Sequence, residues 1–206
     1  MRTVTIQSSP RCYTFVVERT ALLVTDMQRD FCSTGGYLDH SGVDIEILRR
    51  PIEPIRRVLA AARRAGLLVI FTREGHRPGL EDCPHTKLAR TERMGNRIGK
   101  HGPLGRLLIR GSTGHGIVEE LAPLPTETII DKPGKGAFYS TELELILRTR
   151  GIASLLFTGV TTNVCVETTM REAADRGFDN LVLTDATGAI NADVHNQAHH
   201  VSGRHL

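Results

Sequence analysis

Three side chains capable of nucleophilic chemistry each follow a short apolar run of the sequence. Asp26 comes directly after the first of these runs, Lys132 after a later one, and Cys165 a few residues beyond a third. A thiol can attack a carbonyl, a carboxylate can take its proton, and an ammonium group can stabilise negative charge. Each residue alone has an ordinary structural explanation, as a loop cap, a solvated lysine or a small core cysteine. Together they predict hydrolysis of an amide.

The elements that must position these residues are strands alternating with helices. Runs rich in Val, Ile, Leu and Thr predict buried strands at 21–25, 67–72, 128–131, 154–158 and 181–184. Helical patterns at 52–65, 141–150 and 164–176 each end before a glycine. This order predicts an α/β fold, a doubly wound and mostly parallel sheet with helices on both faces. The carboxyl ends of its strands form the expected ligand crevice.

Cys165 is expected in the first turn of a helix, where the macrodipole favours a thiolate. A nearby Lys132 would lower the pKa of the thiol further. The turn at 159–163 leads into this helix, and free backbone N–H groups at a helix start can bind an oxyanion. We expect the N–H groups of Thr161 and Cys165 to form this oxyanion hole.

Composition indicates an ordinary globular protein. The 206 residues fit one domain, 1–206, and the 40% hydrophobic and 24% charged content is close to the globular average. No apolar run approaches the length of a membrane helix, and the first ten residues lack a secretory pattern, so we expect a cytoplasmic protein without membrane contact. The net charge is +3, and a basic cluster between 90 and 110 lacks interleaved aromatics, so we expect no nucleic-acid partner.

Two stretches have weak periodicity. Residues 73–125 are rich in Gly, Pro and His, with a short helix expected at 116–121, and such a segment is either a lid over a site or a disordered insertion. The tail after Asp185 contains His195, His199, His200 and His205. A histidine cluster can bind metal, but a frayed, solvated terminus is the favoured interpretation. Cys32 could line the site, although a structural role is favoured.

Three motifs, in order along the chain, resemble the isochorismatase-like cysteine hydrolases. They are TALLVTDMQRDF at 20–31, DKPGKGAF at 131–138 and GVTTNVCV at 159–166, and the resemblance runs from about residue 15 to 190. It implies a Rossmann-like three-layer sandwich, a catalytic triad of Asp26, Lys132 and Cys165, and a cis peptide at Val160–Thr161 that shapes the oxyanion hole. It also implies a homo-oligomer that acts on a small molecule and has no cofactor.

Within this family the sequence is most similar to biuret hydrolases, through GGYLDH at 35–40, TREGHRP at 72–78 and DKPGKG at 131–136. The implied reaction converts biuret to allophanate and ammonia through a thioester. Ureidoacrylate or N-carbamoyl-amide hydrolysis is the alternative. Vinyl-ether isochorismatases lack the nucleophilic cysteine, so Cys165 favours amide chemistry. A different class of function is a non-catalytic, truncated relative that acts as a scaffold or thiol sensor.

The resemblance also indicates residues around the substrate. Phe31 is expected to form a wall of the pocket, and His76, Arg77 and Thr162 to bind its polar atoms. Metal-dependent nicotinamidases carry an Asp-x-His-x-x-x-His set, whereas this sequence offers His76 without the second histidine, so we expect no metal. The chain departs from its relatives after about residue 190, where 201–206 stands in place of a further strand and a Gln-Gly-Gly segment.

Overall fold

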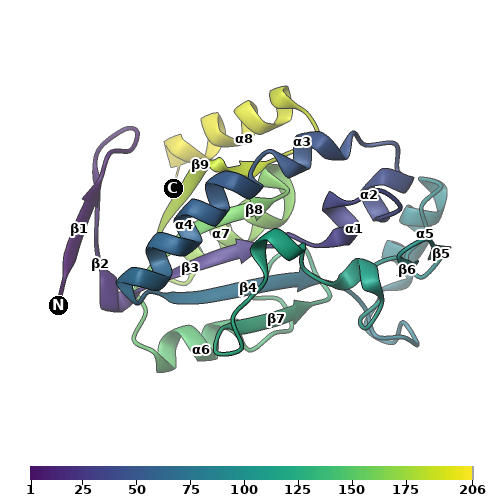
Figure 1. Ribbon diagram of the computed structural model, residues 1–206, viewed down its shortest axis with the longest axis horizontal. Coiled ribbons are helices and arrows are strands. Elements are labelled where there is room, and N and C mark those ends of the chain that lie inside the picture. The colour runs from purple at the N-terminus through teal and green to yellow at the C-terminus, as the bar shows by residue number, and fades with distance from the viewer. Residues whose placement is uncertain (206) are drawn as a thin grey trace.

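A five-stranded parallel sheet forms the centre of the computed structural model, which describes residues 1–205 and the side chains of residues 1–200 (Figure 1). The strand order is β7-β4-β3-β8-β9, and every neighbouring pair is parallel. The strands are β3 (Thr20–Thr25), β4 (Leu68–Glu74), β7 (Thr128–Lys132), β8 (Ser154–Val160) and β9 (Asp179–Gly188). All five predicted strands are therefore present, and the order reverses around β3, as in a doubly wound sheet.

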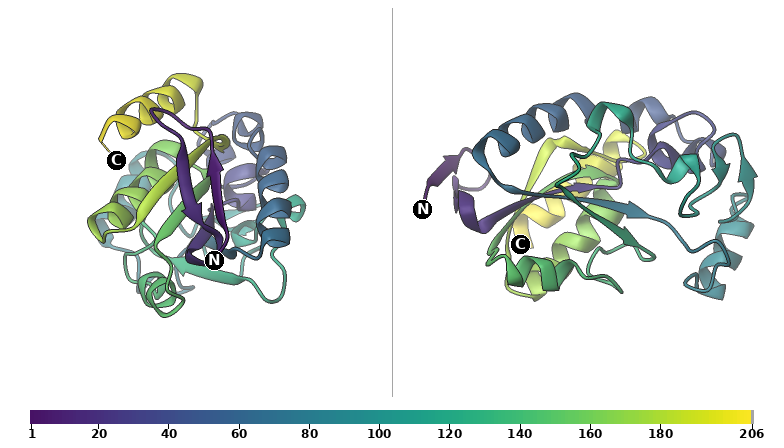
Figure 2. Two further views of the ribbon diagram at one scale, coloured as in Figure 1. Left: turned by 90° about the vertical axis from the view of Figure 1, so that its left-hand side faces the viewer. Right: turned by 60° about the horizontal axis from the view of Figure 1, so that its bottom comes forward.

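Helices cover both faces of the sheet (Figure 2). Helix α4 (Ile52–Ala65) packs on one face, because its buried residues Ile52, Ile55, Leu59 and Ala62 recur at helical spacing. Helices α6 (Leu143–Thr149) and α7 (Glu167–Asp175) pack on the other face, together with alternate residues of β3 and β8. The predicted three-layer arrangement is confirmed, since β3, β4, β8 and β9 contribute apolar residues to the cores on both faces of the sheet.

The predicted helices are present with shifted bounds. The helix predicted at 52–65 coincides with α4 and ends on Gly66, whose φ of 78° makes it a left-handed cap. The helix predicted at 141–150 is present as α6, which is shorter than predicted. The one predicted at 164–176 divides into a π-helical turn, η4 (Thr162–Val166), and α7. Cys165 therefore lies in a π-helical turn rather than in an ordinary first turn.

The remaining elements lie outside the sheet. The first two strands form an antiparallel hairpin that stands beyond one end of the sheet (Figure 1). The hairpin consists of β1 (Thr3–Ile6) and β2 (Tyr13–Val16), and a second short hairpin consists of β5 (His101–Gly102) and β6 (Gly105–Arg106). The other short helices and turns are η1 (Val17–Arg19), α1 (Arg29–Cys32), α2 (Tyr37–His40), α3 (Ile45–Arg49), α5 (His85–Arg93), η2 (Thr113–His115) and η3 (Glu119–Leu121).

The segment 73–125 is ordered, so the alternative of a disordered insertion is wrong. It contains α5 and the β5–β6 hairpin, and short helical turns at η2 and η3 replace the single helix expected at 116–121. Its buried residues include Ile98, Leu107 and Leu121, which join the apolar core on the face covered by α4 or lie beside it. Burial of these side chains fixes the segment across the carboxyl ends of the strands.

The described part of the tail is helical, contrary to the expected frayed terminus. It forms α8 (Ala192–His205), and the rings of His195 and His199 make hydrogen bonds to the hydroxyls of Thr162 and Thr187. The side chains of 201–206, including that of His205, lie outside the described residues, as does the departure expected there. Among the described residues, no helix is both long and apolar enough to cross a membrane.

Gly159 is required where β8 passes the end of β3. Its φ is 103°, and a Cβ at this position would lie 2.0 Å from the carbonyl oxygen of Thr25. Gly177, at the end of α7, also has a positive φ, 77°, but a Cβ there meets nothing within 4 Å. Gly159 is therefore required because a side chain there would clash with the backbone of Thr25, whereas Gly177 serves only the left-handed backbone conformation.

We predict that Gly159→Ala lowers the free energy of unfolding by at least about 3 kcal/mol, because backbone must move to admit the methyl group. The matched variant Gly177→Ala should lose only about 1 kcal/mol, the cost of the left-handed conformation. Urea denaturation of the two variants and the parent measures both losses. Equal losses would contradict the close approach of β8 to β3.

Candidate active site

The three residues singled out in the sequence converge at the carboxyl end of the sheet. Asp26 follows β3, Lys132 ends β7, and Cys165 lies in η4, which follows β8. The register explains the convergence, since Thr25 is paired with Thr72 of β4 on one side and with Gly159 of β8 on the other. Parallel pairing in this register brings all three chain segments out of the sheet at one level.

Asp26 and Lys132 form a fully buried ion pair, with 2.8 Å between Oδ2 and Nζ and no exposed side-chain surface on either residue. The hydroxyl of Thr72 donates to Asp26 Oδ1 at 2.6 Å. Lys132 also donates to the carbonyl oxygens of Gly134 and Lys135, at 3.0 and 2.9 Å. Three acceptors thus match the three N–H bonds of the ammonium group. The ion pair and the hydrogen bonds to the two carbonyls offset much of the cost of removing both charges from water.

Lys132 remains charged in this setting. Burial alone would lower its pKa, but the negative charges of Asp26, of a thiolate at Cys165 and of Glu74 raise it above the ordinary lysine value. The site therefore contains a permanent positive charge beside the sulfur.

The thiol of Cys165 is the third member, and it is 4% exposed. Its Sγ atom lies 3.6 Å from Oε2 of Glu74, and the ligand atoms of Asp26, Glu74 and Cys165 lie within 4.8 Å of one another. Burial raises the pKa of the thiol; Lys132 opposes this rise, whereas Asp26 and Glu74 add to it. The expectation of a lowered pKa is therefore wrong, because desolvation outweighs the nearby ammonium group. The resting cysteine is a thiol, and it needs a base.

Glu74 is the residue that the sequence analysis missed. It is the last residue of β4, opposite Lys132 in the register, and it is completely buried. The predicted strand stopped at residue 72, two residues early. Alternate residues of a strand share a face, so a predicted strand that continued to residue 74 would have placed Glu74 on the same face as Thr72. In the structure, that face lies beside Asp26. Its position after an apolar run is the same signal that identified Asp26 and Lys132.

Glu74 is surrounded by ammonium groups. Its carboxylate lies 2.8 Å from Nζ of Lys87, 3.0 Å from Nζ of Lys135 and 4.0 Å from Nζ of Lys132. Burial alone would raise the pKa of this carboxyl, but Lys135, Lys132 and Lys87 hold it well below the ordinary glutamate value. We call Asp26, Glu74, Lys87, Lys132 and Lys135 the charge cluster.

The charge cluster has more positive than negative groups. Three ammonium groups face two carboxylates, so one positive charge is uncompensated while Cys165 is a thiol. Transfer of the thiol proton to a carboxylate leaves this total unchanged. An anionic intermediate bound to the sulfur would therefore form in a positive environment, which lowers the free energy of its formation.

His76 is engaged by other protein groups, and its predicted contact with substrate stays a prediction. It is buried, its Nε2 accepts from Lys87 at 2.9 Å, and its Nδ1 lies 3.3 Å from Asp82. Burial lowers the pKa of His76, and Lys87 adds to this effect. A neutral ring that accepts at Nε2 and donates at Nδ1 satisfies both contacts. His76 therefore holds Lys87 through a hydrogen bond. In this series of contacts, the side chains of Lys87 and Glu74 lie between His76 and Cys165.

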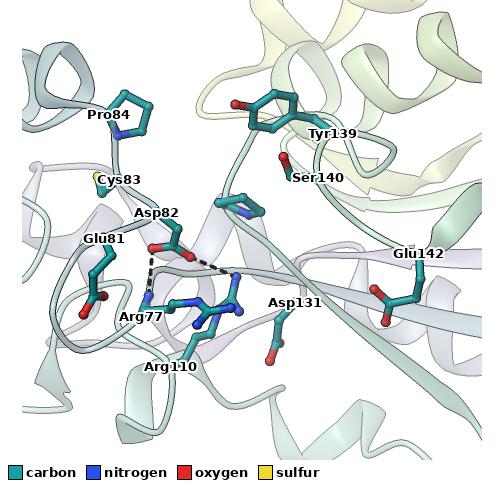
Figure 3. Close-up of a pocket in the computed structure, with 11 residues that line it drawn as sticks. Arg77, Glu81, Asp82, Cys83, Pro84, Arg110, Asp131, Tyr139, Ser140 and Glu142 are labelled. Atoms are coloured by element: carbon teal, nitrogen blue, oxygen red, sulfur yellow. Dashed lines mark hydrogen bonds and ion pairs between the residues drawn. The ribbon is translucent and has the colours of Figure 1, made fainter.

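Arg77 lies outside the charge cluster. Together with Asp82, Arg110 and Asp131 it lines a cavity of about 540 Å³, where its backbone N–H and the Arg110 side chain contact Asp82 (Figure 3). Asp26, Glu74, Lys132 and Cys165 do not line this cavity. The structure therefore does not bring Arg77 to the triad.

Phe31 lies close to Asp26 in the sequence, and Thr162 lies close to Cys165. Both side chains are almost fully buried. Phe31 packs edge to face against Tyr37, with ring centroids 6.4 Å apart. The hydroxyl of Thr162 lies 2.9 Å from Nδ1 of His195 on α8, so this hydroxyl is engaged by the protein. Substrate contact by either residue stays a prediction.

The segment expected to form the oxyanion hole has the expected backbone. The Val160–Thr161 peptide is cis, and Thr161 precedes η4, where its carbonyl accepts from the N–H groups of Val164 and Val166. The role of the Thr161 and Cys165 N–H groups stays a prediction. Cys32 is buried, its sulfur faces the carbonyl of Leu48, and burial raises its pKa to about 12, which favours the structural role.

The acidic and sulfur groups of the site could in principle ligate a metal. Asp26, Glu74 and Cys165 offer three ligand atoms close together. Both carboxylates are already paired with ammonium groups, so a divalent cation would have to displace them and would meet three positive charges. The expectation of a metal-free site stays a prediction.

We predict that alkylation of Cys165 by iodoacetamide rises about tenfold for each pH unit between about 7 and 9, without levelling off. The raised pKa keeps the thiolate scarce over this whole range. Peptide mass spectrometry measures the rate at Cys165 separately from that at Cys12. The same peptide in urea-unfolded protein is the control and should level off near the ordinary cysteine value. A plateau below about pH 8 in the folded protein would mean that the resting group is a thiolate.

Comparison with known proteins agrees with this geometry. The isochorismatase domain model matches residues 20–201. Ureidoacrylate amidohydrolase RutB of Cronobacter sakazakii is 37% identical over 195 residues, which cover 91% of this chain and 82% of the relative. The Methylorubrum extorquens protein of the same name is 36% identical over 192 residues, covering 89% and 75%.

Solved structures show the same fold. A cysteine hydrolase from Pseudomonas syringae pv. phaseolicola is 27% identical with a TM-score of 0.80, and the match covers 93% of this chain and 88% of that one. N-carbamoylsarcosine amidase from Thermoplasma acidophilum is 26% identical with a TM-score of 0.69, covering 90% and 93%. On the extent of the domain match and of these similarities, the chain belongs to the isochorismatase family.

Proposed function

We propose that this protein is a cysteine-dependent amidohydrolase of small ureides, with Cys165 as nucleophile. Its named relatives are amidohydrolases, so the chain is a hydrolase of carbon–nitrogen bonds other than peptide bonds. The single observation that carries the proposal is the buried set of Asp26, Lys132 and Cys165 at the end of the sheet. The alternative of a scaffold or thiol sensor receives no support from these relatives.

Ureidoacrylate is the substrate we favour. The relatives at 36 to 37% identity carry the name ureidoacrylate amidohydrolase, and a structural neighbour is named N-carbamoylsarcosine amidase. The sequence motifs placed biuret first and ureidoacrylate second, and these names favour the reverse order. All three substrates share a carbonyl bonded to two nitrogens, one of them a terminal NH₂, so one mechanism serves all of them.

The first half of the reaction transfers the acyl group to the enzyme. Asp26 takes the proton of Cys165, and the sulfur attacks the carbonyl carbon of the ureide. The negative charge that develops on the carbonyl oxygen is stabilised by the excess positive charge of the cluster and by the N–H groups of Thr161 and Cys165. Asp26 returns the proton to the terminal nitrogen, and ammonia leaves.

The second half releases the product. The acyl group, now a thioester-type adduct with its retained nitrogen, is attacked by water, and Asp26 takes a proton from that water. The carbon–sulfur bond breaks and the thiol is restored with the proton. Lys132 holds the carboxylate of Asp26 throughout, since their 2.8 Å contact does not depend on the substrate.

We predict Cys165-dependent release of ammonia in a panel of ureidoacrylate, biuret, an N-carbamoyl amino acid and nicotinamide, with ureidoacrylate turned over fastest. Cys165→Ala should lower kcat/KM at least about a thousandfold, because the nucleophile is lost. Asp26→Asn should lower it about a hundredfold or more, because the base is lost.

The matched control is Cys32→Ala, which removes a buried thiol that the mechanism does not use. It should keep kcat/KM within about threefold of the parent, on the small effects expected away from the reacting atoms. Turnover that survives Cys165→Ala, or silence of the parent across the whole panel, would refute the proposed function.

A further inference from the structure

Glu74 presents a second carboxylate to the nucleophile, and the proposed reaction leaves it without a role. Its Oε2 lies 3.6 Å from Sγ of Cys165. Its pKa is held far below the ordinary glutamate value by Lys135, Lys132 and Lys87, against the effect of burial. Glu74 is therefore a poor base that stays ionised, and an ionised carboxylate only accepts hydrogen bonds.

The two oxygens of Glu74 have different partners. Oε1 accepts from Lys87 at 2.8 Å and from Lys135 at 3.0 Å. Oε2 accepts from Lys135 at 3.0 Å and from the thiol of Cys165. When the thiol gives up its proton, Oε2 loses this donor and keeps an unused lone pair that faces the sulfur. A buried acceptor of this kind is unfavourable until another donor replaces the lost one.

A ureide can supply a new N–H donor to Oε2 of Glu74 beside the reacting carbon. The leaving NH₂ is common to every primary amide, so the donor that differs between amide classes is an N–H on the retained side of the carbonyl carbon, one bond from the atom that the sulfur attacks beside Oε2. Ureidoacrylate and biuret retain such an N–H after a terminal NH₂ has left as ammonia, whereas the retained nitrogen of N-carbamoylsarcosine carries a methyl group and has no hydrogen to donate. A simple carboxamide has a CH₂ group there, which offers no hydrogen bond. Glu74 is thus suited to distinguish the two classes of amide.

Lys87 holds Glu74 from the side away from Cys165. Its ammonium group, which comes from α5, donates to Glu74 and to the carbonyl of Pro133, both at 2.8 Å, and to Nε2 of His76 at 2.9 Å. Three acceptors satisfy its three N–H bonds. His76 is held in turn by Asp82. The orientation of the Glu74 carboxylate is therefore fixed before a substrate binds.

We propose that Glu74 is a specificity-determining residue, whose Oε2 accepts the retained N–H of the ureide in place of the Cys165 thiol, and that Lys87 is the positioning residue for it. The proposal rests on the proposed function and names the group by which ureides are preferred over simple amides.

The experiment compares 3-ureidoacrylate with glutaconic acid monoamide, which has CH₂ in place of the retained N–H. The parent protein should prefer the ureide at least about tenfold in kcat/KM. In Glu74→Gln the side-chain oxygen is taken by the lysines and the NH₂ group faces the substrate, so the preference should fall to about threefold or less. The loss should occur with the ureide, while turnover of the monoamide changes little.

Two further variants complete the test. Glu74→Gln leaves an extra positive charge, so the double variant Glu74→Gln, Lys87→Met restores the charge balance and should show the same loss of preference if the single variant does not fold. Glu144→Gln, which alters a surface ion pair with Arg148 and Arg176, is the matched control and should keep the parent preference.

The outcomes separate the two proposals. A parent that turns over neither compound nor any other ureide of the panel refutes the proposed function, and the inference with it. An active parent whose preference survives in the Glu74 variants refutes the inference alone. An equal loss with both compounds also refutes it, because Glu74 would then act as a base or a support and would not select the substrate.

Discussion

The structure depends on keeping five charged side chains together, three of them without any contact with water and Lys135 at the exposed margin. Asp26, Glu74 and Lys132 have no exposed side-chain surface, and an isolated charge in such a place would be strongly disfavoured. Mutual pairing offsets this cost, and the backbone carbonyls that follow β7 supply the remaining acceptors. The same burial that makes the pairing necessary also raises the pKa of the Cys165 thiol, so the features that stabilise the site determine its chemistry.

The sheet explains how so many charges reach one point. Its central strands β3, β4 and β8 are apolar on both faces and therefore carry charge only where they end. Parallel pairing brings those ends to one edge, and the ordered segment 73–125 covers that edge and contributes Lys87 through α5. Gly159 allows β8 to approach β3 closely enough for η4 to place the sulfur within 4.8 Å of both carboxylates.

Sequence alone was sufficient for the sheet, its order of elements and the convergence of Asp26, Lys132 and Cys165, because apolar runs and their end residues are local features. It failed for Glu74 and for the environment of His76. Both depend on where β4 ends and on α5, a helix of mostly polar residues whose Lys87 is buried against Glu74. The direction of the Cys165 pKa shift was also wrong, since the sequence indicates nearby charges but not the degree of burial.

The most direct test of this account is to quench the protein with acid during turnover of excess ureidoacrylate and to weigh its peptides. The peptide containing Cys165 should gain the mass of the acyl group left after loss of ammonia, and no other peptide should gain it. An acyl group on a different residue, or active turnover with Cys165 unmodified at every quench time, would contradict nucleophilic attack by the sulfur within the charge cluster.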